Sequence, residues 1–155
     1  MAPAPLTVRE RQIVDSWLTC IECVGSELDS VRAVSLRKPT ATVDTLTKDL
    51  LAGLVGLRLS NVQSQFNAYY TMLVDYTASM GDSLHISRTD YVAHYSASVS
   101  GIYRSRAAIA LGRIGGIPAR NALDAALDSA ASASSNFPPT VVAAVRFARD
   151  TLWIP

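Results

Sequence analysis

One stretch decides the fold: residues 106–127, which read RAAIALGRIGGIPARNALDAAL. Alanine and leucine recur at helical spacing in its two halves, and Gly115-Gly116 followed by Pro118 separates the halves. Alanines let two helices approach closely, the glycine pair turns the chain, and leucines cover the helix pair against a following unit. The stretch therefore predicts one helix–turn–helix unit.

This unit resembles the HEAT-repeat family, in the variety named after phycobilisome lyases. Residues 141–147 look like the opening helix of a following unit, because Ala143 falls 36 positions after Ala107, close to the period of about 40–47 of HEAT units. Residues 26–53 fit the same pattern as a degenerate unit. The resemblance implies an α-solenoid of stacked helical hairpins.

The remaining segments also repeat at helical period, and no run shows the alternation typical of strands. Thr7 and Glu10 form a capping box for a first helix that ends near Gly25. A Ser87 cap predicts another helix start. We expect further helices over about 26–36, 42–52, 57–80, 87–114, from Pro118 to a flexible linker at 129–136, and from Pro138-Pro139 to the Trp153-Ile154-Pro155 end.

A long helix pair over about 57–103 matches no repeat. Its first helix has a wide apolar arc and only two charged residues, Arg58 and Asp75, which predicts contacts on more than one side. The sequence thus predicts an all-α fold, an α-solenoid of HEAT-like helical hairpins with a long inserted helix pair. We expect a single domain over 1–155, with a degenerate repeat at about 26–53, a helical insertion at about 57–103, a repeat at about 104–129 and a partial capping repeat at about 138–153.

Composition excludes several broad classes. The chain has 155 residues, 49% of them hydrophobic and 17% charged, with a formal net charge of +1. Such a chain is not disordered as a whole, and its net charge does not favour nucleic acid or an anionic membrane. The longest apolar run, residues 50–57, is too short to cross a bilayer, and the first residues lack the features of a secretory signal. We expect a soluble, cytoplasmic protein without a transmembrane segment.

Cys20 and Cys23 form the sharpest local motif, a CxxC pair. Haem attachment fails because Val24 stands where a histidine is required. A structural zinc needs four ligands, and only His85 and His94 remain, at no recognised spacing. A redox dithiol favours a thiolate at a helix N-terminus, whereas these cysteines follow a predicted helix C-terminus. Structural thiols or a local disulfide are the favoured interpretations, so we expect no metal and no cofactor.

No catalytic set stands out in the sequence. His94 lies one helical turn after Asp90, but no nucleophile is placed beside them by any motif. Some HEAT-like proteins bind iron through His-Glu dyads, and the sequence contains none. We therefore expect a protein without catalytic activity.

A partner-binding surface is expected on the long helix and the helix after it. Residues 91–123 contain no Asp or Glu but four arginines, and all six tyrosines fall within 69–103. Tyrosine and arginine are enriched at interfaces, although the pattern favours arginines that bridge adjacent helices and tyrosines packed in a core. The candidate partner-binding residues are Tyr91, Tyr95, Arg104, Arg106, Arg113 and Arg120.

These observations favour a helical-repeat scaffold or an accessory subunit of a larger assembly, with a protein as its partner. An alternative implied by the resemblance is a protein that handles tetrapyrroles, as bilin lyases do. A third hypothesis is binding to the nucleic-acid backbone through the helical-repeat surface, which the near-neutral net charge makes less favoured.

Overall fold

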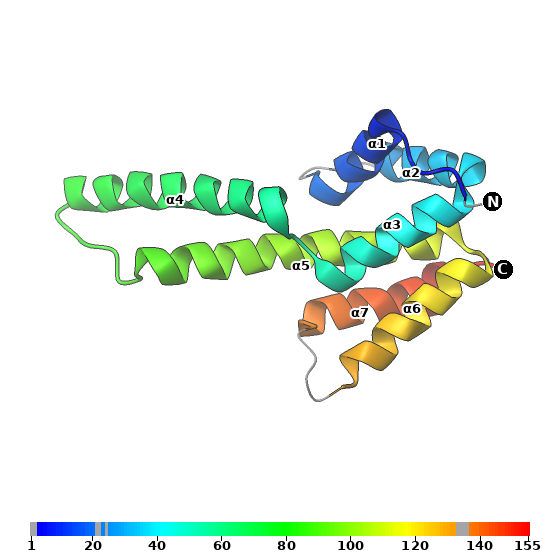
Figure 1. Ribbon diagram of the computed structural model, residues 1–155. Coiled ribbons are helices and arrows are strands. Elements are labelled where there is room, and N and C mark those ends of the chain that lie inside the picture. Colours follow the sequence, from blue (N-terminus) through cyan, green and yellow to red (C-terminus); the bar gives the residue numbers. More distant parts are fainter. Residues whose placement is uncertain (1–2, 21–22, 24, 133–136) are drawn as a thin grey trace. The chain divides into compact units, whose positions relative to one another are not determined.

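The computed structural model describes residues 3–20, 23, 25–132 and 137–155 (Figure 1). Within those ranges the chain is helical and contains no strand, which confirms the all-α prediction. The helices are α1 (Val8–Thr19), α2 (Ser26–Arg37), α3 (Pro39–Ala52), α4 (Gly56–Ser79), α5 (Arg88–Ile114), α6 (Gly116–Ala130), α7 (Pro139–Phe147) and the π-helical turn η1 (Ala148–Leu152). No helix of the described ranges is both long and apolar enough to span a membrane.

The chain divides into two compact units. The first unit comprises Met1–Gly53 and Gly101–Pro155, and the second unit comprises Leu54–Ser100. Helix α5 contributes residues 88–100 to the second unit and residues 101–114 to the first. In sequence, the second unit nearly coincides with the predicted insertion at about 57–103. That the whole chain forms a single domain stays a prediction.

The first unit is a series of packed helices. Helix α1 packs against α2, α2 against α3, α3 against α6, and α6 against α7. Their apolar faces meet in a core of small and branched side chains, because such residues recur every three to four positions along each helix. The fully buried members include Val14, Leu18, Val31, Val34, Leu46, Leu50, Ala107, Leu111, Leu123, Val141 and Val145.

Local capping fixes several helix starts. The predicted capping box of α1 is present: the Glu10 amide donates to Thr7 Oγ1 at 3.1 Å, and the Thr7 amide donates to Glu10 Oε1 at 2.9 Å. The Asp90 amide donates to the Ser87 hydroxyl at 3.1 Å, as predicted for α5. Helix α3 begins at Pro39, earlier than the predicted residue 42, because a proline in the first turn needs no amide donor.

The C-terminal segment packs onto the glycine turn between α5 and α6. A Cβ on Gly112 would lie 2.7 Å from the Ala148 carbonyl oxygen, so only glycine permits this approach. The Gly116 amide donates to the Ile154 carbonyl at 2.9 Å, and Trp153 Nε1 donates to the Gly116 carbonyl at 2.8 Å. Of the predicted linker at 129–136, helix α6 takes in 129 and 130, and residues 133–136 lie outside the described residues.

The second unit is an antiparallel helical hairpin of α4 and the first half of α5 (Figure 1). The Leu54 amide donates to Ser100 Oγ at 3.1 Å where the hairpin begins. At its far end, Tyr70 donates its hydroxyl proton to the Ile86 carbonyl at 2.7 Å. Although α4 has 24 residues, none of its side chains is fully buried.

Candidate functional site

An aromatic cluster joins the two helices of the second unit. The ring of Tyr91 lies 4.6 Å from that of Tyr95, 5.3 Å from that of Tyr70 and 6.3 Å from that of Phe66, centroid to centroid. The rings of Phe66 and Tyr95 stack at 5.5 Å. Tyr91 is only 8% exposed and Tyr95 is 41% exposed. Tyr91 therefore holds the hairpin together, whereas Tyr95 also presents part of its ring to solvent.

A stripe of exposed apolar side chains follows α4. We call Tyr69, Met72, Tyr76 and Met80 the α4 stripe; their exposed fractions are 43%, 65%, 62% and 67%. They are spaced three to four residues apart, so they lie on one face, with Met80 at the C-cap. The sequence drew attention to Tyr69 and Tyr76 among its six tyrosines, but they are not among the candidate partner-binding residues, and Met72 and Met80 were missed. The signal that could have found them is the near absence of charge over 57–80 combined with this regular spacing of Tyr and Met.

Arg104 is buried and engaged within the first unit. Its Nε donates to the Leu50 carbonyl at 2.8 Å, and Nη2 donates to the Leu51 carbonyl at 3.3 Å. The guanidinium also lies 4.3 Å from the centroid of the Phe137 ring. Burial lowers the pKa of Arg104 below its usual range. These hydrogen bonds give partners to two carbonyls near the C-terminus of α3, so Arg104 caps this helix.

Arg106 faces the two cysteines, which form a disulfide. Its Nη1 lies 2.7 Å from Cys20 Sγ and 3.0 Å from Cys23 Sγ, and it donates to the Trp17 carbonyl at 3.0 Å. In return, Trp17 Nε1 donates to the Arg106 carbonyl at 2.9 Å, and the guanidinium lies 5.1 Å from the Trp17 ring centroid. The structure pairs the two cysteines of the CxxC motif, and the role of the pair stays a prediction.

The remaining two predicted arginines lie further along the first unit. Arg120 Nε lies 3.5 Å from Asp124 Oδ2, its Nη1 donates to the Arg149 carbonyl at 3.4 Å, and its guanidinium lies 5.0 Å from the Trp153 ring centroid. Arg113 is exposed. Three of the four arginines thus bond to protein groups at separate places in the first unit. Partner contact by the six candidate residues stays a prediction.

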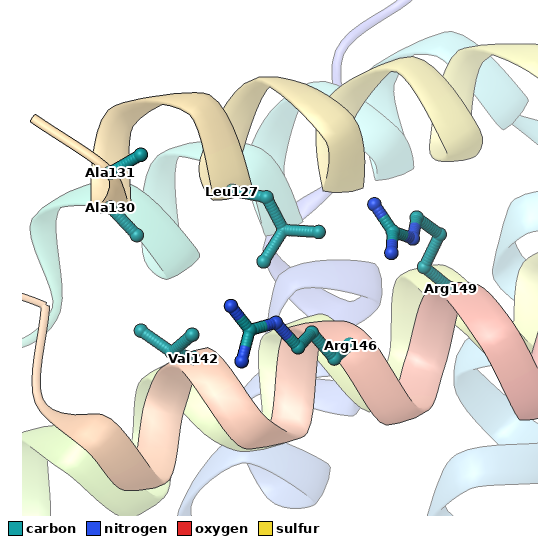
Figure 2. Close-up of a pocket in the computed structure, with 6 residues that line it drawn as sticks. All are labelled: Leu127, Ala130, Ala131, Val142, Arg146 and Arg149. Atoms are coloured by element: carbon teal, nitrogen blue, oxygen red, sulfur yellow. The ribbon is translucent and has the colours of Figure 1, made fainter.

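A small cavity lies between α6 and α7 (Figure 2). Its volume is about 260 Å³. Figure 2 shows the guanidinium of Arg146 reaching into the space between the two helices. Arg149 Nε lies 2.7 Å from Asp150 Oδ1; this hydrogen bond raises the pKa of Arg149 and lowers that of Asp150. The cavity is lined by Leu127, Ala130, Ala131, Val142, Arg146 and Arg149. It is smaller than the roughly 300–1,000 Å³ typical of sites for drug-sized ligands.

In the part of the chain that the structure describes, no group of three or more His, Cys, Asp or Glu side chains is placed to hold a metal ion. The ring of His94 lies 4.9 Å from that of Tyr95, in an edge-on contact. The described residues thus offer two candidate sites: the α4 stripe on the second unit, and the Cys20–Cys23 disulfide beside Arg106 in the first unit.

No protein-family model matches the chain, and searches of curated proteins and of solved structures find no match either.

Proposed function

We propose that this chain is a non-catalytic helical-repeat protein that binds another protein through the α4 stripe, as a scaffold or an accessory subunit of a larger assembly. The observation that carries the proposal is that no side chain of the 24-residue helix α4 is fully buried, while the α4 stripe is 43–67% exposed. A helix of this length gains most of its stability in proteins from packing an apolar face. Contiguous exposed apolar surface of this kind is typical of interaction sites.

The chemistry of the stripe favours a protein partner with an apolar face. Tyrosine and methionine are enriched at protein interfaces, because tyrosine combines a large apolar ring with a polar tip and methionine adapts its shape. Helix α4 carries only Arg58 and Asp75 as charged residues, so it offers little electrostatic attraction to phosphates. An amphipathic helix that lays its apolar side along α4 is the partner of matching chemistry.

The proposal assigns the first unit the role of a HEAT-like support. Helices α2 and α3 pack together, and α3 in turn packs against α6, as neighbouring helices of stacked hairpins do. The close approach of Gly112 to Ala148 brings α5 against the segment after α7. These packings support an α-solenoid arrangement for 26–53, 104–129 and 138–153.

The two other hypotheses gain no specific support. The cavity of about 260 Å³ between α6 and α7 is small for a tetrapyrrole. Nucleic-acid backbone binding relies on basic side chains available to phosphates, whereas Arg104, Arg106 and Arg120 donate to groups of the protein itself. Both stay predictions that rank below protein binding.

Site-specific photo-crosslinking in the native source tests the proposal. A photoreactive phenylalanine analogue replaces Tyr76 in one variant and Ser64 in another; Ser64 is exposed on α4 but lies about 120° around the helix axis from Tyr76. We expect irradiation to join the Tyr76 variant to one other protein, and the Ser64 variant to yield much less of that adduct. The purified partner should then bind the wild-type chain in calorimetry.

Two results would overturn the proposal. One is equal crosslinking from Tyr76 and Ser64, which would show that the stripe is no preferred contact. The other is an adduct of the chain with a second copy of itself, which would assign the stripe to self-association.

A further inference from the structure

We propose that Cys20 and Cys23, with Arg106, form a thiol–disulfide exchange site that reacts reversibly with dithiols. The inference does not depend on the proposed binding function, because all the residues it uses lie in the first unit. Its basis is one guanidinium nitrogen, Arg106 Nη1, within hydrogen-bond distance of both sulfurs, at 2.7 Å and 3.0 Å.

Arg106 is fixed in this position from two directions. Its side chain donates to the Trp17 carbonyl, and its own carbonyl accepts from Trp17 Nε1, so two bonds connect the same pair of residues. Trp17 is buried in the core. A guanidinium held in this way keeps its positive charge beside the sulfurs at ordinary pH, because arginine does not lose its proton in proteins.

The charge changes the chemistry expected from the motif. Cys20 caps the C-terminus of α1, and the negative end of a helix dipole disfavours a thiolate there. A full positive charge in direct contact outweighs the partial charge of a helix end and favours the thiolate, which is the reactive form of cysteine. Cys20 and Cys23 are both partly exposed residues, so the pair is not enclosed in the core.

The exchange reaction balances without a metal or a cofactor. A thiolate of the dithiol attacks one sulfur, the Cys20–Cys23 bond breaks, and the departing sulfur leaves as a thiolate beside Arg106. The second thiol of the dithiol then displaces the other cysteine. The dithiol ends as a disulfide, one cysteine ends as the thiolate beside Arg106, and the other ends as a thiol with the proton of the second thiol, so two electrons pass from the dithiol to the protein.

A structural staple explains this disulfide less well. The bridged cysteines are three positions apart, and a disulfide stabilises a fold less when the loop that it closes is short. The arginine contact also has no bearing on closing such a loop. A reactive cysteine pair accounts for both the short loop between the cysteines and the contact with Arg106.

The test measures how alkylation of the reduced protein depends on pH. The full chain is reduced with dithiothreitol, the reductant is removed, and iodoacetamide adducts on Cys20 and Cys23 are counted by mass from about pH 5 to about pH 9. We expect half-maximal alkylation at a pH about one to three units lower in the native protein than in the same protein unfolded in guanidinium chloride. This comparison uses only the wild-type chain, so it does not depend on any variant folding.

Variants then assign the effect to Arg106. Arg106→Gln should move the native pH profile toward that of the unfolded protein, Arg106→Lys should restore part of the shift, and Arg113→Gln, an exposed arginine of the same helix, should leave it unchanged. Identical profiles for native and unfolded wild type would overturn the proposal. So would an unchanged profile in a folded Arg106→Gln variant, or a disulfide that dithiothreitol does not reduce in the native protein.

Discussion

At the scale of single residues, Glu10 connects three parts of the first unit. Its carboxylate accepts from the Thr7 amide at 2.9 Å and from Lys38 Nζ at 2.6 Å, and it lies 3.6 Å from Arg37 Nη2. The start of α1 is thereby tied to the junction of α2 and α3. The hydrogen bond from Lys38, together with that from the Thr7 amide, lowers the pKa of Glu10 from 4.5 to about 2.

This lowered pKa predicts a pH dependence of stability. Because the folded protein holds Glu10 ionised more strongly than the unfolded chain does, the contribution of Glu10 is present above about pH 4.5 and is lost as the pH falls toward about 2. Glu10→Gln should therefore melt at a lower temperature than wild type at neutral pH. The difference between the two should shrink as the pH approaches about 2 in thermal melts followed by circular dichroism. A constant difference across that range would contradict the assignment.

Asp49 is the second polar residue that organises the first unit. Its Oδ1 accepts from the Tyr103 hydroxyl at 3.0 Å and from Arg11 Nη2 at 3.1 Å. Tyr103→Phe should lower the free energy of unfolding by about 1–2 kcal/mol, because it removes a hydrogen bond to a buried carboxylate. Urea denaturation measures this loss. Tyr69→Phe, which alters an exposed hydroxyl that bonds Gln65, should change stability far less, and equal losses would contradict the role of Asp49.

At the scale of helices, the sequence predicted the features that residues close together in the chain determine, such as where a helix starts. The starts of α1 and α5 follow from Thr7 and Ser87, whose capping bonds span three positions. Partners far apart in the chain could not be predicted in this way. Arg104 bonds carbonyls more than 50 positions away and Arg106 bonds Trp17 across 89 positions. The absence of Asp and Glu over 91–123 marked these arginines as notable. Only the packing of α5 shows that Arg104 and Arg106 donate to groups of the protein itself.

The glycines of α5 provide a matched pair of tests for that packing. A Cβ on Gly112 would lie 2.7 Å from the Ala148 oxygen and 2.9 Å from the Ala148 Cβ, whereas a Cβ on Gly101 would meet nothing within 4 Å. Gly112→Ala should therefore destabilise the protein by about 1–3 kcal/mol. Gly101→Ala should be neutral or stabilising by up to about 1 kcal/mol, because alanine favours helix. Equal effects in denaturant titrations would contradict the close approach of α5 to Ala148.

At the scale of the whole molecule, the two units differ in how their apolar residues are used. The first unit fully buries leucine and valine from most of its helices, whereas no side chain of α4 in the second unit is fully buried. The sequence predicted that the helix over 57–80 makes contacts on more than one side. Within the second unit, the aromatic cluster accounts for one side only. The side of α4 that carries the α4 stripe has no such packing, and in our proposal the protein partner supplies its contacts.

Because the α4 stripe is exposed, substitutions in it should change partner binding without changing the stability of the fold. Because Met72 and Tyr76 are 65% and 62% exposed, Met72→Glu and Tyr76→Glu should leave the unfolding midpoint nearly unchanged while weakening partner binding at least tenfold. The loss in binding is expected because a charge buried at an interface without a counter-charge is costly. Ser64→Glu on the same helix should bind as wild type does. A large drop in the midpoint of the Tyr76 variant would instead make the stripe part of the folded core.

The most direct test of the central claim is the mass of the complex that contains this chain, purified from its native source under gentle conditions. The account predicts a stable complex of fixed stoichiometry with a different protein for the wild-type chain and for Ser64→Glu, and the free chain for Tyr76→Glu. A wild-type chain that is recovered free would contradict the claim, as would a complex that survives unchanged in Tyr76→Glu.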